Sequence, residues 1–278
     1  MNRALDARSL GRRIVPAAVV RLLRRASLWE KRAHFRPYLV TRSVQGELFP
    51  SYIGDVTGKL WYGHRNVTSP ELPFIRDRMI SPGDLIFDVG AHHGFYAAYM
   101  ARRAARVLAI EPNPHNVMIL QKNISLNGLH NVIVRRAAVG DAVGKISLLR
   151  DSDQGGISFS STGTSPAIEV ELLPLDELAK EYGFPQLLKI DVEGFEASVL
   201  RGASEIMRRR PKIAIEMHVD WVARYGSSVK EVVDLLQLES YRVFLLRHKS
   251  EQVKPWNGEE LPAEPPPKFH LFLLPDHS

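Results

Sequence analysis

Residues 85–116, LIFDVGAHHGFYAAYMARRAARVLAIEPNPHN, decide the fold of this chain. Two apolar runs, each ending near an acidic residue, enclose a glycine-containing turn and an alanine-rich segment with helical spacing. We predict strands over residues 85–90 and 106–111, with a helix over 94–104 between them. A strand–helix–strand unit of this length is typical of a parallel sheet that is covered by helices.

The alternation of strands and helices continues towards the C-terminus. Further strands are predicted over residues 132–138, 187–192, 212–217, 241–246 and 269–274. Further helices are predicted over residues 114–126, 175–182, 194–209 and 228–238. Residues 145–171 interrupt this order with stretches of alternating polarity, which predict an antiparallel excursion. The sequence therefore predicts an α/β fold, with a mostly parallel sheet that carries helices on both faces.

The segment before this alternation has a different composition. Residues 37–62 are rich in β-branched and aromatic residues, and turn signals at Gly46, Pro50 and Gly54 divide them into short predicted strands. Residues 71–80 have the pattern of a helix. We expect this part to form a lid or cap before the main domain. The predicted organisation is a basic helical extension, a small β/helix cap and a large α/β domain, at residues 1–36, 37–80 and 81–278.

Composition limits the class of protein. The 278 residues are 45% hydrophobic and 24% charged, which is ordinary for a globular chain. The absence of cysteine excludes disulfides, thiolate zinc sites and cysteine nucleophiles. It fits a reducing compartment, and we predict a cytoplasmic location. No apolar run approaches the roughly 18–20 residues that span a bilayer.

Positive charge is concentrated at the N-terminus. Residues 1–36 contain ten Lys/Arg and two Asp/Glu, a net charge of +8 against +6 for the whole chain, so the remainder carries −2. The balance of the remainder argues against a broad nucleic-acid surface. A predicted helix in this segment has an apolar face and an arginine face. The apolar face consists of Val19, Leu22, Leu23 and Ala26. The arginine face consists of Arg21, Arg24 and Arg25.

Two interpretations of the basic helix remain open. It either contacts a membrane surface or an anionic partner, or docks on its own domain with the arginines in solvent. No signal peptide is expected, because the apolar run from Ile14 to Val20 is seven residues long and contains Pro16.

The acidic residues and glycines of the opening stretch indicate a ligand site. In an open α/β sheet, ligands bind outside the carboxyl ends of the strands. Asp88 and Glu111 lie at two such ends, and Gly90 and Gly94 flank the turn, where a glycine lets a ligand approach the main chain. Glu111 is placed to accept two hydrogen bonds from a ribose diol. The alternative is a tight turn with two exposed acids, but the combination favours a nucleoside cofactor.

The spacing of the turn distinguishes between cofactors. Dinucleotide enzymes use G-x-G-x-x-G with the pyrophosphate at the helix N-terminus. Here the turn is DVGAHHG, with glycines four apart and an acid two residues before the first. That acid would repel a pyrophosphate and favour a cation. S-adenosylmethionine has an ammonium group, a free ribose diol and no phosphate, so the sequence favours it over NAD.

The segment from Leu85 to His218 resembles the FkbM-type family of S-adenosylmethionine-dependent methyltransferases. The blocks that carry the resemblance are IFDVGAHHGFYA, VLAIEPNPHNVMILQKNISLNG, AAVGD, LLKIDVEGFEASVLRGA and AIEMH. The resemblance implies a Rossmann-like class I methyltransferase fold, with a seven-stranded sheet whose last strand is antiparallel. It also implies O-methylation of a hydroxyl on a small molecule, a sugar, a glycan or a lipid.

The resemblance assigns residues to the cofactor site by position. It places Asp88, Gly90, Ala91 and Gly94 along the methionine end, Glu111 at the ribose with Pro112 and Asn113 beside it, and Ala138 near the adenine. Phe95 and Asp191 complete the expected set. His92 is a departure, since the family usually has asparagine there, and a ring nitrogen would have to take over any contact with the cofactor.

The block KIDVEGFE supplies candidates for catalysis. Methyl transfer to a hydroxyl requires an in-line arrangement and removal of a proton. Asp191, Glu193 and His218 are the candidate bases, with Lys189 and Glu216 as neighbours that could tune them. The alternative is that Asp191 binds the cofactor, Glu193 has a structural role and His218 merely ends a strand.

Three alternative interpretations compete with this assignment. Asp191, Glu193, Glu216 and His218 could ligate a metal, but the acid–base interpretation is favoured and no metal is predicted; the adjacent His92 and His93 are weaker ligand candidates. A nicotinamide-dependent oxidoreductase lacks the expected glycine spacing. A non-catalytic, membrane-associated binding protein on the same fold would depend on residues 1–36. The sequence specifies neither the acceptor nor an oligomeric state.

Overall fold

The computed structural model describes residues 34–149, 167–248, 250–259, 261 and 268–276. The chain divides into two units, residues 1–36 and residues 37–278. The predicted basic helix lies outside the described residues, as does the middle of the predicted excursion at 150–166. Within the part that is described, no helix is long and apolar enough to cross a membrane.

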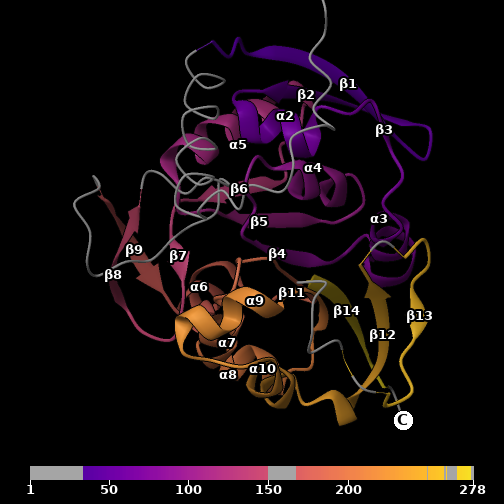
Figure 1. Ribbon diagram of the computed structural model, residues 1–278, viewed down its shortest axis with the longest axis vertical. Coiled ribbons are helices and arrows are strands. Elements are labelled where there is room, and N and C mark those ends of the chain that lie inside the picture. Colours follow the sequence, from indigo (N-terminus) through magenta and orange to yellow (C-terminus); the bar gives the residue numbers. More distant parts are fainter. Residues whose placement is uncertain (1–33, 150–166, 249, 260, 262–267, 277–278) are drawn as a thin grey trace, which may run out of the picture. The chain divides into compact units, whose positions relative to one another are not determined.

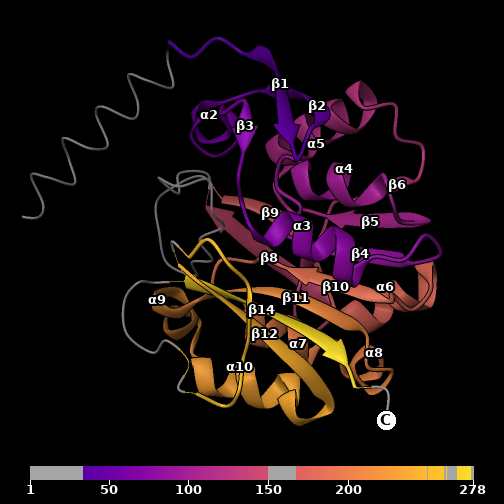
Figure 2. The same cartoon turned by 90° about the vertical axis from the view of Figure 1, so that its right-hand side faces the viewer.

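A mostly parallel sheet forms the centre of the second unit (Figures 1 and 2). Its order is β13-β12-β14-β11-β10-β4-β5-β6, and β14 runs antiparallel to both of its neighbours. The seven predicted strands are all present, at β4 (Leu85–Val89), β5 (Arg106–Ile110), β6 (Val132–Arg135), β10 (Leu187–Ile190), β11 (Lys212–His218), β12 (Tyr241–Arg247) and β14 (Lys268–Pro275). The two-residue strand β13 (Lys254–Pro255) adds an eighth at the edge. The predicted class I methyltransferase fold is therefore confirmed.

Helices cover both faces of this sheet, which explains why every residue of β4 and β10 is buried. On one face lie α4 (Phe95–Ala101) and α5 (Pro114–Leu126) (Figure 1). The other face packs against α6 (Leu175–Tyr182), α7 (Glu196–Arg201), α8 (Ser204–Arg208) and α10 (Val229–Leu236). Short helical segments follow β11 and α10, at α9 (Val219–Val222), η2 (Ala223–Tyr225) and η3 (Leu238–Ser240).

The helix predicted over residues 194–209 is two helices, α7 and α8. The break falls at Gly202, where a side chain would meet the carbonyl oxygen of Gly140 at 2.0 Å. Asp176 then accepts hydrogen bonds from the backbone N–H groups of Glu205 and Ile206, which satisfies the start of the second helix. The periodicity of the segment did not reveal the break because the buried positions continue across it.

The cap precedes the sheet and packs on α4. It consists of β1 (Tyr38–Val44), β2 (Glu47–Ile53), α2 (Val56–Tyr62), β3 (Asn66–Val67), α3 (Glu71–Phe74) and a π-helical segment (Ile75–Met79). The strands were predicted, but residues 56–62 are helical rather than extended, because Asp55 caps the segment by accepting from the N–H of Gly58 at 2.6 Å. Phe49 packs against Phe95 and Tyr99 of α4.

A smaller sheet forms the predicted excursion. Its strands β7 (Ala138–Val139), β9 (Ala167–Leu173) and β8 (Gly144–Leu149) lie in that order, and β8 pairs with β9 in antiparallel fashion, as expected. Strand β7 follows β6 in the chain and leads the backbone away from the central sheet. The change of chain direction after β6 brings Ala138 to the edge of the central sheet at which the parallel strands end.

Candidate active site

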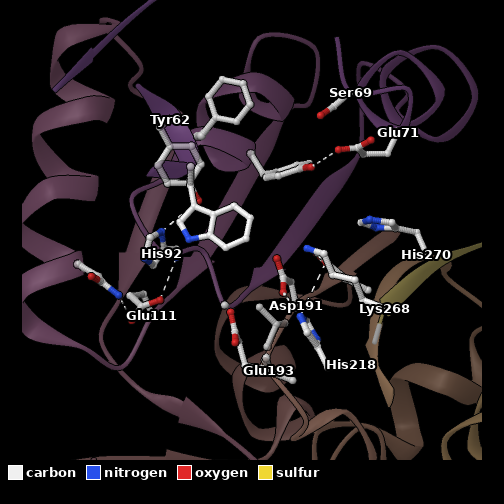
Figure 3. A pocket seen from close by; sticks show the side chains of 18 of the residues that line it. Tyr62, Ser69, Glu71, His92, Glu111, Asp191, Glu193, His218, Lys268 and His270 are labelled. Atoms are coloured by element: carbon white, nitrogen blue, oxygen red, sulfur yellow. Dashed lines mark hydrogen bonds and ion pairs between the residues drawn. The ribbon is translucent and has the colours of Figure 1, made fainter. Parts of the chain in front are cut away.

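A cleft of about 510 Å³ lies at the carboxyl ends of β4, β5 and β10, and the cap supplies its opposite wall. Strand β4 pairs with β5 on one side and β10 on the other, so this is the point where the strand order reverses. The cleft is lined by nine of the residues predicted for the site, namely Gly90, His92, Phe95, Glu111, Pro112, Ala138, Asp191, Glu193 and His218. Figure 3 shows how the labelled members of this set face one another.

The turn after β4 brings the ends of two strands into direct contact. Gly90 has a φ of +82°, and its N–H and that of Ala91 both donate to the carbonyl of Ile110 at 3.0 Å. A side chain at Gly90 would meet the carbonyl oxygen of Asp191 at 1.9 Å. Glycine is therefore required here for its backbone angle and for space, and the close approach places Asp191 beside the turn.

Glu111 is held by the backbone around it. Its carboxylate accepts from the N–H groups of His92 and Asn113, both at 2.9 Å, and from the side-chain amide of Asn116 at 3.2 Å. Burial raises the pKa of Glu111, although these hydrogen bonds act in the opposite direction. A carboxylate accepts about four hydrogen bonds. The side chain of Glu111 lines the cleft, and one of its acceptor positions therefore remains for a hydroxyl group of a ligand.

His92 presents a neutral ring beside Glu111. Its Nδ1 lies 3.0 Å from the hydroxyl of Tyr62, and its ring stacks on His93 at a centroid distance of 3.9 Å. Burial, with help from His93, lowers the pKa of His92 to about 3. The imidazole is therefore uncharged at neutral pH. Because Tyr62 occupies Nδ1, Nε2 is the ring nitrogen that remains for a ligand.

Asp88 occupies a different place from the one expected. Its side chain is fully buried and does not line the cleft, which corrects the expectation that the carboxylate projects into the crevice. The register places it beside Lys189 of β10, whose Nζ lies 3.4 Å from Oδ1 of Asp88. Burial raises the pKa of Asp88, and Lys189 opposes this rise. Asp88 is therefore connected to the cleft through Lys189 and, beyond it, Asp191.

Lys189 joins Asp88 to Asp191. Its Nζ also lies 3.3 Å from Oδ2 of Asp191, whose side chain does line the cleft. Burial opposes ionisation of Asp191, but Lys189 and His218 hold the pKa of this carboxyl well below its usual range. Asp191 is thus a fixed carboxylate at the edge of the cleft and a poor proton acceptor at neutral pH.

His218 is held as a cation. Its Nδ1 donates to Glu196 at 3.0 Å, and its Nε2 lies 3.8 Å from carboxylate oxygens of both Asp191 and Glu216. Burial disfavours the protonated form of His218, but the hydrogen bond to Glu196 and the carboxylates of Asp191 and Glu216 raise the pKa of His218 to about 9. The fully buried Glu196 also accepts from the N–H of Gly194, so one carboxylate fixes both His218 and the turn that carries Glu193.

Glu193 has the proton affinity of a general base near neutral pH. Burial and the charge of Asp191 raise the pKa of Glu193 to about 7, while His218 and Lys268 limit the rise. Its φ of +57° is unusual for a residue with a side chain. Figure 3 shows Glu193 on the same side of the cleft as Asp191 and His218. The other two candidates are held in their charged forms, so Glu193 is best suited to accept a proton.

The same cluster contains three side chains with metal-binding groups. Oxygen and nitrogen atoms of Asp191, Glu216 and His218 lie within 4.8 Å of one another. Cations of the protein already contact them, however: Lys189 lies beside Asp191, and Nζ of Lys268 is 2.5 Å from Glu216. His218 is protonated at neutral pH. The arrangement is therefore that of a charge network, in which a metal would compete with two lysines and a proton.

Besides Asp88, three residues predicted for the cofactor site do not line the cleft. Asn113 caps α5 by accepting from the N–H of His115 at 2.9 Å. Ala91 is buried within the turn, and Gly94 begins α4 against Leu120. These residues shape the backbone around Glu111 and Gly90, and they lie behind the lining side chains.

Several lining residues were missed by sequence reasoning. Arg42, Trp61 and Tyr62 come from the cap, and Lys268 and His270 come from β14. The cap lies outside the family resemblance, so no motif marked it. The available signal was the density of aromatic and polar residues from 61 to 71, which is unusual for a segment that merely covers a domain. Lys268 carried no signal, because its place beside Glu216 depends on the antiparallel pairing of β14 with β11.

The sequence matches a known protein family. Residues 88–243, more than half of the chain, match the model of the methyltransferase FkbM domain. Over 155 residues the chain is 29% identical to a hexuronic acid methyltransferase of Haloferax volcanii, covering 55% of this chain and 61% of that protein. It is also 29% identical to the methyltransferase sdnD of Sordaria araneosa, covering 43% of this chain and 60% of that protein.

Among solved structures, one similar chain is the methyltransferase FkbM of Methylobacillus flagellatus KT. It shares 18% sequence identity and has a TM-score of 0.46, with 70% of this chain and 44% of that chain covered. The chain spans about three-fifths of the length of the two curated relatives named above.

Proposed function

The chain belongs to the FkbM family of methyltransferases, and we propose that it transfers the methyl group of S-adenosylmethionine to a hydroxyl group of a sugar-containing acceptor. The observation that carries the proposal is the single cleft that contains both Glu111 and the cluster of Asp191, Glu193 and His218. One end of this cleft suits a nucleoside, and the other end contains a base with a pKa near 7.

The residues present fit this cofactor. Glu111 has a free acceptor position for the ribose diol, and Gly90 leaves its main chain open to close approach. The carboxylates of Asp191 and Glu193 suit the sulfonium and ammonium groups and would oppose a pyrophosphate. A nicotinamide dinucleotide is therefore disfavoured. Ala138, at the start of β7, lines the part of the cleft that we assign to the adenine.

When bound, S-adenosylmethionine supplies an electrophilic methyl group, which a nucleophilic oxygen takes with cleavage of the carbon–sulfur bond. The task of the protein is to hold the acceptor oxygen in line and to remove its proton. In this proposal Glu193 accepts the proton from the acceptor hydroxyl. Asp191, which Lys189 holds in its ionised form, stabilises the positive charge of the bound cofactor. The imidazolium of His218 fixes the position of Asp191.

The wall of the cleft formed by the cap supports a sugar as acceptor. The indole of Trp61 is 55% exposed and lines the cleft, with Nζ of Lys268 at 5.1 Å from its ring. Asn66, Thr68 and Ser69 line the same wall. An aromatic face beside hydrogen-bonding side chains suits the apolar face and the hydroxyls of a pyranose. The name of the Haloferax relative, a hexuronic acid methyltransferase, points to the same class of acceptor.

The test is methyl transfer from isotopically labelled S-adenosylmethionine to a panel of acceptors. The panel contains neutral glycosides, hexuronic acids, phenols and long-chain alcohols, and products are identified by mass spectrometry. We expect the label on a sugar in a form that resists mild alkali, as an ether does. Label released by mild alkali would indicate a carboxyl ester and contradict the hydroxyl assignment. Binding of the cofactor without transfer to any sugar would contradict the proposed acceptor class.

A further inference from the structure

Arg42 of β1 is an unusual cation in this cleft. Its side chain is only 3% exposed, yet it lines the cleft. The guanidinium carbon lies 3.7 Å from the centre of the Phe95 ring and 5.4 Å from that of Tyr62. Burial lowers the pKa of Arg42 to about 10, which leaves it protonated at neutral pH. The cap therefore inserts a buried positive charge against the first residue of α4.

This charge has no carboxylate partner among the described residues. Its Nε donates weakly to the carbonyl of His64 at 3.4 Å, and its buried Nη1 has no hydrogen-bond acceptor. The other cations that line the cleft are paired, Lys268 with Glu216 and His218 with Glu196. A buried, unpaired guanidinium is costly unless a ligand completes it, and an arginine is suited to a carboxylate because its N–H groups match the two oxygens.

The position of Arg42 selects the ligand. Phe95 begins the helix that follows the glycine turn, and Tyr62 contacts His92 within that turn. The guanidinium therefore lies beside the part of the cleft where the amino acid end of the cofactor is expected. We infer that Arg42 binds the carboxylate of the methionine portion of S-adenosylmethionine, so that the cap completes the cofactor site. The inference rests on the proposed function.

The experiment compares two ligands that differ only in this carboxylate. Calorimetry measures the binding of S-adenosylhomocysteine and of its decarboxylated form, S-adenosyl-3-thiopropylamine, to the full chain. We expect the wild-type chain to prefer S-adenosylhomocysteine by roughly tenfold to a hundredfold, as a charge-assisted bidentate contact would give. In the variant Arg42→Met, the affinity for S-adenosylhomocysteine should fall by the same factor, and that for the decarboxylated form should stay unchanged.

Arg102→Met is the matched control. Its guanidinium also lies 3.7 Å from a phenylalanine ring, that of Phe49, but it is outside the cleft. This variant should keep both affinities. A thermal melt of each variant reports folding, and we expect Arg42→Met to be no less stable than wild type, because it removes an unpaired buried charge.

The outcomes separate the inference from the function. Equal affinity of the wild-type chain for the two ligands, or an equal loss of both in Arg42→Met, would overturn the role of Arg42 and leave the cofactor assignment standing. Equal affinities in the wild-type chain overturn the inference even where the variant does not fold. Binding of neither ligand to the wild-type chain would remove the proposed function, and the inference with it.

Discussion

Glu193 and His218 lose their protons in different pH ranges, and the proposed reaction requires an ionised Glu193 together with a protonated His218. The pKa of Glu193 is about 7, raised by burial and by Asp191 and Glu216 against the opposing charges of His218 and Lys268. The pKa of His218 is about 9. Activity should therefore rise as pH increases through about 7 and fall as pH increases through about 9. The measurement is kcat/KM as a function of pH.

The variant Glu193→Gln tests which residue causes the rise in activity near pH 7, the acidic limb of the pH profile. We expect kcat to fall by about 10² to 10⁴, the usual contribution of a general base, and the limb near pH 7 to disappear. Affinity for S-adenosylhomocysteine should change far less than kcat, because this ligand lacks the sulfonium charge and its ribose is assigned to Glu111. An unchanged acidic limb in this variant would transfer the role of base to another group. In wild type, the limb in kcat should lie at lower pH than in kcat/KM, since a bound sulfonium favours the ionised carboxyl.

Trp61 is the residue at which recognition of the acceptor can be separated from that of the cofactor. Trp61→Ala should raise the KM for a sugar acceptor by about threefold to tenfold, the loss expected from one aromatic contact. Affinity for S-adenosylhomocysteine should be unaffected. The neighbouring Leu60 is 65% exposed and does not line the cleft, so Leu60→Ala is the control. An equal rise in KM in both variants would mean that the helix, and not the indole, is responsible.

At the scale of elements, the contact between the turn after β4 and the end of β10 is the most constrained part of the site. Gly90→Ala adds a side chain that would meet the carbonyl of Asp191 at 1.9 Å, at a φ of +82°. We expect a large loss of stability, and no binding of S-adenosylhomocysteine by the folded fraction. Gly128→Ala is the control, because its φ is +63° but its surroundings are open. It should cost about 1–2 kcal/mol in urea unfolding.

Helix α2 is attached to the main domain through its N-cap. Asp55 accepts from the N–H of Gly58, and its other oxygen lies 3.0 Å from Nε2 of His115 and 3.4 Å from Nε2 of His93. Burial alone would raise the pKa of Asp55, but hydrogen bonds from His115 and His93 hold it below the usual range. The stabilising contribution is therefore present at neutral pH and is lost as the pH falls through the folded-state pKa.

Asp55→Ala should cost about 1–2 kcal/mol in unfolding free energy and should also weaken binding of S-adenosylhomocysteine, because α2 carries Tyr62. Ser228→Ala removes the N-cap of α10, where the side chain accepts from the N–H of Glu231. It should cost a similar free energy and leave ligand affinity unchanged. If both variants lose affinity equally, the effect of Asp55 is one of general stability.

At the scale of the whole molecule, residues 37–278 form a unit with its own cores, and residues 1–36 carry a net charge of +8. We expect a chain truncated to 37–278 to keep its melting temperature and its affinity for S-adenosylhomocysteine. Flotation with vesicles that contain anionic lipid should recover more of the full chain than of the truncated chain at low salt. Equal recovery of the full and the truncated chain would support the interpretation in which the predicted basic helix docks on its own domain.

The order and type of most central elements could be predicted from the sequence because each is a local property. A buried parallel strand needs an unbroken apolar run, and a surface helix needs a stripe of apolar residues, so the pattern alone identified the helix over 114–126 and its neighbours. The helix at residues 56–62 was missed, because one capping bond from Asp55 outweighed the β-branched composition. Asp88 and Glu111 could also be identified from the sequence, because each lies at the end of an apolar run that marks a strand.

By itself, the sequence determined the α/β fold with a mostly parallel sheet, the turn with Gly90 and the place of Glu111 at the end of β5, because strand periodicity and glycine requirements are local. Only the tertiary structure decided that Asp88 is enclosed with Lys189 and that Glu193 has the raised pKa. It alone also brought Arg42 from the cap into the cleft. Burial and charge pairing depend on which distant segments meet, and no spacing along the chain records those meetings.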